Sequence, residues 1–90
     1  MPRGTFHLVG LDEGGVRGRP DNLRLVCLIQ SAGKLAIWGK HENRHNIDAV
    51  MNAGVPCTVE CEYREPNPIH AQNFGHTHWV PEDFELKVVA

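Results

Sequence analysis

The chain has 90 residues, of which 41% are apolar and 22% charged, and its formal net charge at pH 7 is −2. A chain of this length forms one domain and buries roughly 60–70% of its unfolded surface, which is enough for a single core. The net charge argues against indiscriminate binding of polyanions. Residues 1–5 lack a secretory signal and no stretch reaches the ~18 apolar residues of a membrane span, so we expect a cytoplasmic protein without membrane contact.

The first half of the chain predicts three strands. Residues 5–11 are rich in β-forming side chains, and residues 12–21 contain glycines and a proline that are typical of a loop. Residues 22–30 are largely apolar on both faces, which favours a central strand or one covered on both sides. Residues 34–39 predict the next strand, and the short connection at residues 31–33 indicates that these two strands form a hairpin.

One short helix is expected between Asn46 and Gly54. Asn46 is a favourable N-cap residue, and Gly54 supplies the C-terminal stop. The apolar positions follow the i, i+3, i+4 spacing of one buried face and are Ile47, Val50 and Met51.

The second half returns to strands. Residues 55–64 show the strongest alternation of apolar and polar side chains in the chain, which predicts a strand with one buried face. Residues 65–75 contain two prolines and predict a long connection. Residues 78–80 can form a short strand, and residues 84–89 alternate again in a last strand.

The alternating positions and the helical stripe together define the predicted core. It comprises Leu23, Leu25, Cys27, Ile29, Leu35, Ile37, Ile47, Val50, Met51, Val59, Cys61, Phe84 and Leu86. The three cysteines are an odd number and occupy apolar positions, which predicts buried, reduced thiols. Cys57 and Cys61 are four residues apart on one strand, about 13 Å, which is beyond the reach of a disulfide or a shared zinc ion.

The order of three strands, one helix and two strands resembles the OB-fold. The resemblance covers nearly the whole chain, from Phe6 to Val89, and rests on element order and length. It implies a mainly β domain with one short helix, in the form of a five-stranded Greek-key barrel of order βββαββ. An SH3-like barrel or another small α+β sheet is the alternative. The short strand at residues 78–80 departs from the five-strand pattern.

Trp38 is the first candidate for ligand binding. By alternation it shares a face with Lys34 and Lys40, and Arg24 on the partner strand can lie on the same side. An aromatic side chain flanked by cations holds single-stranded nucleic acid, because bases stack on the ring and the cations neutralise phosphates. The OB-fold resemblance implies the same face. The alternative is that Trp38 packs beneath residues 65–75 or against a second copy of the chain.

Arg17 and Arg19 are a second candidate for phosphate contacts, and the alternative there is a solvated turn. Lys and Arg outnumber Asp and Glu by seven to four in residues 1–45 and are outnumbered by two to seven in residues 46–90. The two halves therefore carry +3 and −5. This asymmetry can make one face basic, and it can equally support head-to-tail self-association.

The histidines raise a different hypothesis. His76 and His78 form an H-x-H pair, whose side chains on a strand project from one face about 7 Å apart. Together with His70 or a carboxylate such as Glu82, they could hold one metal ion with an open position for hydrolysis. Purely structural histidines are the alternative.

These patterns favour a non-enzymatic binding module without a cofactor, which holds single-stranded nucleic acid or a small oligomeric ligand on the face of Trp38. The sequence contains no nucleophile elbow, Gly-rich phosphate loop or recognisable pair of catalytic carboxylates. A homo-oligomeric interaction module that buries the same face is the second hypothesis. A metal-binding protein or small metallo-hydrolase that uses His76 and His78 is the third.

Overall fold

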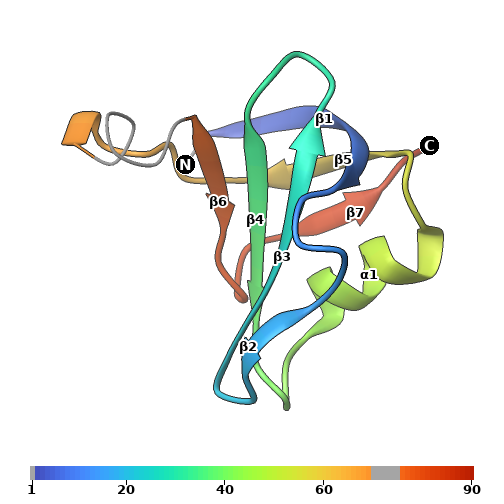
Figure 1. The fold of residues 1–90 in the computed structure, drawn as a ribbon, viewed down its shortest axis with the longest axis vertical. Coiled ribbons are helices and arrows are strands. Elements are labelled where there is room, and N and C mark those ends of the chain that lie inside the picture. Colours follow the sequence, from blue (N-terminus) through green and yellow to red (C-terminus); the bar gives the residue numbers. More distant parts are fainter. Residues whose placement is uncertain (1, 70–75) are drawn as a thin grey trace.

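The computed structural model of the chain describes residues 2–69 and 76–90. Within them, strands and one helix form a mainly β structure (Figure 1). The elements in chain order are β1 (Arg3–Leu11), β2 (Arg17–Arg19), β3 (Asn22–Ile29), β4 (Lys34–Gly39), α1 (His45–Ala53), β5 (Cys57–Glu62), β6 (Thr77–Val80) and β7 (Leu86–Val88). The strands predicted from alternation are therefore confirmed in β1, β3, β4 and β5, and the last strand is shorter than predicted.

The described strands form a single open sheet of seven strands in the order β6-β4-β3-β1-β5-β7, with β2 attached to β3. All neighbours are antiparallel except β4 and β6, which run parallel. The long strand β1 pairs with β5 up to Leu8 and with β3 from Leu8 onward, and its register shifts between Leu8 and Gly10. Figure 1 shows β5 and β7 crossing the direction of β3 and β4.

The prediction of a five-stranded OB-like barrel is wrong, and an SH3-like barrel is excluded for the same reason. A barrel closes only when its two edge strands pair with each other. Residues 77–80 instead form β6, which takes the outer edge of β4 in parallel, while β7 takes the outer edge of β5. In the described part of the chain these two strands do not pair, so the sheet stays open.

The segment predicted as a loop before β3 contains the short strand β2. Arg17 pairs with Arg24 and Arg19 with Asn22. Gly18, between the two arginines, has a positive φ of 103°, and a Cβ built there would collide with the backbone oxygen of Asn22. Glycine is therefore required for the close approach of β2 to β3.

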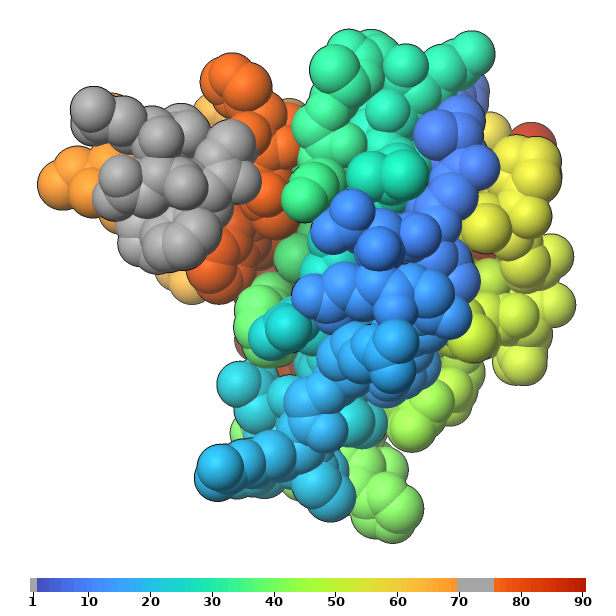
Figure 2. Space-filling view, in the orientation of Figure 1, coloured from blue at the N-terminus to red at the C-terminus, as the bar shows by residue number. Residues whose placement is uncertain are grey.

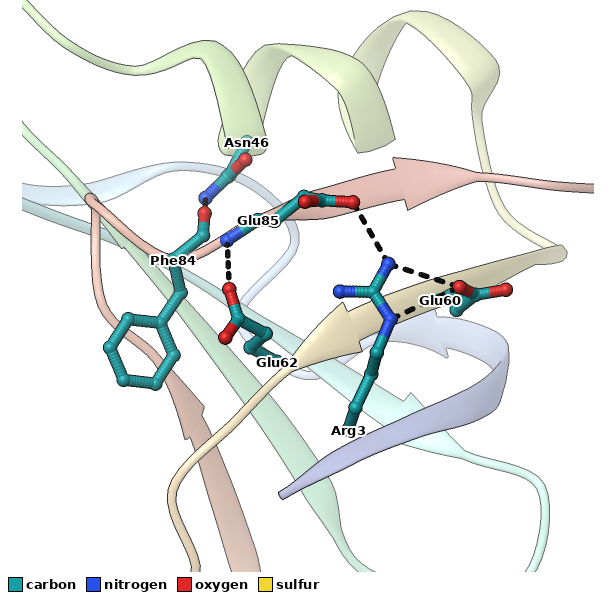
Figure 3. A network of polar contacts seen from close by, with 6 residues as sticks. All are labelled: Arg3, Asn46, Glu60, Glu62, Phe84 and Glu85. Atoms are coloured by element: carbon teal, nitrogen blue, oxygen red, sulfur yellow. Dashed lines mark hydrogen bonds and ion pairs between the residues drawn. The ribbon is translucent and has the colours of Figure 1, made fainter. Parts of the chain in front are cut away.

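The helix begins at His45, and its N-cap position lies two residues before Asn46, the predicted N-cap. The N-cap position is Arg44, which makes no side-chain capping bond. The Asn46 side chain is buried, and its Nδ2 donates to the backbone oxygen of Phe84 at 2.8 Å (Figure 3). Asn46 thus ties α1 to the chain just before β7. Gly54 is the C-cap as predicted, with its N–H bonded to the oxygen of Val50.

The hydrophobic core joins one face of β3 and β4 to β1, β5, β6, β7 and α1. Its buried members are Leu8, Leu23, Leu25, Cys27, Ile29, Leu35, Ile37, Ile47, Val50, Cys57, Val59, Cys61, Val80 and Leu86. Two predicted core residues differ from this set, because Met51 is 42% exposed and Phe84 is only partly buried. The helical stripe is narrow, and Met51 lies outside it. All three cysteines are free and buried, as predicted.

An exposed ion-pair network links β1 to β5 and to the residue just before β7. The Arg3 guanidinium on β1 donates to Glu60 on β5 and to Glu85 just before β7, at 3.0 and 2.9 Å (Figure 3). The backbone N–H of Glu85 in turn donates to Glu62 at 3.3 Å. These contacts lie far from β4 in the strand order, so this network is separate from the face that carries Trp38.

Candidate functional site

The strand register places the residues singled out by the sequence on one face of the sheet. Arg17 on β2 pairs with Arg24 on β3, which pairs in turn with Trp38 on β4. Directly paired residues project to the same side of a sheet, and so do residues two apart on one strand. We call the shared surface the Trp38 face, and its members are Arg17, Arg19, Arg24, Lys34, Trp38 and Lys40.

A second tryptophan, which sequence reasoning missed as a site residue, lies on the same face. Trp79 on β6 pairs in parallel with Ala36, two residues before Trp38. The two indoles stack, with centroids 5.8 Å apart and an interplanar angle of 27°. Both side chains are half-buried. The available signal was that alternation in β6 puts Trp79 on the side opposite His78, but only the long-range β4–β6 pairing reveals its neighbour.

The indole N–H of Trp38 is buried and has no hydrogen-bond partner in residues 2–69 and 76–90. Leaving such a donor unpaired generally costs about 1–3 kcal/mol. Among the described residues nothing offsets this cost, which a phenylalanine of similar shape would avoid. Unpaired buried donors are rare in folded proteins, and they call for an explanation other than packing.

Beside the stacked indoles the surface is hollowed into a pocket of about 360 Å³. Residues from β3, β4, β6 and the turn after β6 line it: Asn22, Trp38, Gly39, Lys40, Trp79, Pro81, Glu82 and Asp83. The two indoles and Pro81 make its apolar wall, while Asn22 and the carboxylates supply polar groups. A concave, mostly apolar pocket with a few polar groups is typical of a small-ligand site.

Three of the cations on the Trp38 face already have carboxylate partners. Arg24 pairs with Glu13 at 3.0 Å, and Lys34 pairs with Asp12 at 3.2 Å. Both acids belong to the segment between β1 and β2, which crosses the front of the molecule in Figure 2. The hydrogen bond from Arg24 to Glu13 raises the pKa of the guanidinium. This segment therefore covers and neutralises one end of the face.

At the pocket end, Lys40 pairs with Glu82 at 2.9 Å. That hydrogen bond is the main reason why the pKa of Lys40 is raised, and the charges of Glu82, Glu42 and Asp21 raise it further. Asp83 has no ion pair among the described residues. The surroundings of the pocket are therefore acidic, with one lysine among several carboxylates.

Arg17 and Arg19 differ from the other cations. Both are exposed, and neither has a carboxylate partner in the part of the chain that the structure describes. Arg17 donates to the backbone oxygen of Glu13 at 2.7 Å, which orients its guanidinium without neutralising it. Two strand spacings separate β2 from β4, about 10 Å. Arg17 and Arg19 thus lie on the same face as the indoles, two strands away from Trp38.

The predicted histidine site is not assembled among the described residues. His78 projects from β6 on the side opposite Trp79, and its ring contacts those of Phe6 and Tyr63 at centroid distances of 5.4 and 5.2 Å. His76 is exposed, and Glu82 is engaged by Lys40. No group of three or more His, Cys, Asp or Glu side chains within residues 2–69 and 76–90 could hold a metal ion. His70 lies outside the described residues.

No protein-family model, curated protein or solved structure matches this chain. Among the described residues, no helix has the length and apolar character needed to cross a membrane. The Trp38 face combines two stacked indoles, an acidic pocket and two arginines without a carboxylate partner in the described part of the chain.

Proposed function

We propose that this chain is a non-enzymatic binding module that holds single-stranded nucleic acid on the Trp38 face. The observation that carries the proposal is the stacked pair of Trp38 and Trp79, set beside Arg17 and Arg19 by the strand register. Bases of any sequence can stack on indoles, and arginines on a strand about 10 Å from β4 can reach the connecting phosphates. The OB-fold resemblance no longer supports this function, which rests on the local chemistry alone.

A single strand suits this face better than a duplex. In a duplex the bases are stacked on one another, so their faces are closed to a protein side chain. The Trp38 face also lacks the broad positive surface that duplex binding requires, because Arg24, Lys34 and Lys40 are each paired with a carboxylate. The ligand contacts are therefore expected to come from ring stacking first and from phosphates second.

The charge distribution sets the expected salt dependence. If Arg17 and Arg19 each contact one phosphate, log K should fall against log salt with a slope of about −1.4, since each contact contributes about −0.7 for single strands. This is a shallow dependence, in keeping with a net charge of −2. Changing both arginines to glutamine should abolish most of the slope. The matched control is Lys87→Gln on β7, an exposed cation away from the Trp38 face.

Intrinsic fluorescence tests the proposal directly, because both tryptophans of the chain belong to the site. Titration with twelve-nucleotide single strands at low salt should quench the emission. Base stacking is worth roughly 1–3 kcal/mol per base, so Trp38→Ala should weaken binding on the order of tenfold, measured by competition with a labelled strand. Trp38→Phe keeps a ring for stacking and should lose less.

Absence of quenching at low salt, with no binding of the labelled strand, would contradict the proposed function. Self-association through the same face makes a different prediction. In that case Trp38→Ala, or a charge placed at this position, should reduce the particle mass measured by light scattering. A mass change without strand binding would assign the Trp38 face to a second copy of the chain.

A further inference from the structure

We infer that the pocket beside Trp38 and Trp79 is a subsite for one nucleobase that carries an exocyclic amino group, and that it discriminates against uracil and thymine. The inference rests on the proposed function and adds to it a preference among bases. Its starting point is the difference in shape between the pocket and the rest of the Trp38 face. The pocket is an open depression with about 360 Å³ of space, so it can seat a base that the stacked indoles alone would only support.

The apolar wall of the pocket suits the faces of a flat ring. Trp38 and Trp79 form one side, and Pro81 follows β6 directly. The backbone N–H of Phe84 bonds to the oxygen of Pro81 at 3.0 Å, which closes the turn containing Glu82 and Asp83. This turn holds both carboxylates at the pocket. The edge of a base stacked against an indole would therefore face these two carboxylates.

The polar side chains at the pocket are two carboxylates, the Asn22 amide and the Lys40 ammonium, which is paired with Glu82. Ionised carboxylates accept hydrogen bonds and donate none. Glu82 uses Oε1 for Lys40, which leaves Oε2 and further lone pairs, and Asp83 has no ion pair among the described residues. Cytosine and adenine present an amino donor to such acceptors, whereas uracil and thymine present the O4 acceptor at the corresponding position. An oxygen facing a carboxylate gains no hydrogen bond and is repelled, and the one donor that uracil and thymine have at this edge, N3–H, lies between two such oxygens.

The charge around the pocket determines which part of the strand can enter it. Lys40 lies among Glu82, Glu42 and Asp21, whose charges all raise its pKa. This acidic environment disfavours a phosphate in the pocket and admits a neutral base. Arg17 and Arg19, which have no carboxylate partner among the described residues, lie on β2 instead. The phosphate backbone is thus directed toward β2, and the base toward the turn after β6.

The experiment compares oligocytidylate and oligouridylate of equal length, twelve nucleotides, with the whole chain at low salt. The two bases have the same size and differ in the amino or oxo group at C4 and in the N3 proton. We expect the cytidine strand to bind more tightly by on the order of tenfold, since one well-formed pair of hydrogen bonds to a base edge discriminates to about this extent. This comparison needs no variant, so it does not depend on the folding of one.

Two near-isosteric changes then locate the preference. Glu82→Gln and Asp83→Asn each add an amide donor, so at least one of them should raise the affinity for oligouridylate and lower the affinity for oligocytidylate. Asp48→Asn, on α1 and outside the pocket, is the matched control and should leave the ratio unchanged. Retention of folding is checked by the thermal transition of each variant.

The outcomes separate this inference from the proposed function. Equal affinity of the wild-type chain for both strands would overturn the base preference while leaving single-strand binding intact. A preference for cytidine that persists in both pocket variants would show that another part of the face reads the base, and would overturn the assignment of the pocket. If neither strand binds, the proposed function fails and this inference fails with it.

Discussion

The two faces of the β3–β4 hairpin are made by alternating residues of the same strands, and burial constrains them to different degrees. On the inner face, Leu25 and Ile37 are fully buried in the core. On the Trp38 face, Arg24 and Trp38 pair in the same ladder but remain partly exposed. Burial dictates which residues the inner face can hold. The opposite face is buried only in part, at Val26 and Ala36, and it also holds two half-buried tryptophans and a row of cations.

The largest expected effect concerns the cysteines, whose reactivity measures how completely the inner face is shielded from solvent. Cys27 and Cys61 are fully buried, and burial raises the pKa of their thiols to about 12 and about 11. Few thiolates are therefore present at pH 8. We expect both to react with a thiol reagent at least ~1000-fold more slowly in the native than in the unfolded chain, since reaction requires opening of the core. Cys57 is 9% exposed at a surface pocket and should react first.

Rapid native labelling of two or more thiols would show that the inner face is not the sealed layer described above. The control is the same reagent in denaturant, where all three should react at similar rates. Mass spectrometry of partly labelled protein identifies which cysteine has reacted.

Truncating one side chain on each face of β4 should give the next largest difference, here in the free energy of unfolding. Ile37→Ala should lower the free energy of unfolding by about 2–5 kcal/mol, because it removes buried methyl groups and leaves a cavity. Lys34→Ala, on the same strand but the opposite face, should cost about 1 kcal/mol or less, since its ion pair with Asp12 is exposed to solvent. Denaturant titration of both variants measures the difference. Comparable losses would mean that the two faces are equally constrained by folding.

The smallest effect is expected at the polar edge where Arg3 joins β5 to the start of β7. The hydrogen bond and charge of Arg3 lower the pKa of Glu85 from its usual 4.5. A carboxyl group with a depressed native pKa stabilises the fold above its unfolded pKa, and this contribution is lost as the pH falls through the native value. Below about pH 4.5, Glu85→Gln should therefore lose stability slightly less steeply than the wild type, as measured by thermal midpoints. Identical slopes would show that the contact contributes nothing measurable.

The difference between local and long-range information explains what could be predicted from the sequence. The buried positions of β3, β4 and β5 follow from a period of two, which a single strand displays by itself. The barrel was wrong because the parallel pairing of β4 with β6 depends on a contact between distant segments that no periodicity encodes. Asn46 was assigned as a cap because its residue type favours that role, yet the tertiary contact with Phe84 decided its position.

The candidate site shows the same difference between local and long-range information. Trp38, Arg24 and the two lysines were placed on one face by alternation within a hairpin. The register confirms this for Trp38, Arg24 and Lys34, and Lys40, just after β4, lines the same pocket as Trp38. Trp79 was missed because it joins the face only through β6. The carboxylates that neutralise Arg24 and Lys34 come from the segment after β1, whose path over the face could not be read from its glycine-rich composition.

The parallel pairing of β4 with β6 also bears on the order of folding events. The hairpin of β3 and β4 closes locally, whereas Trp38 and Trp79 are about 40 residues apart in the sequence. Forming the second contact requires closure of a long loop, whose entropy opposes early pairing, so we expect it late in refolding. The stacked indoles would then report their own assembly. In stopped-flow refolding, the change in tryptophan emission should lag behind the burial of the hairpin core.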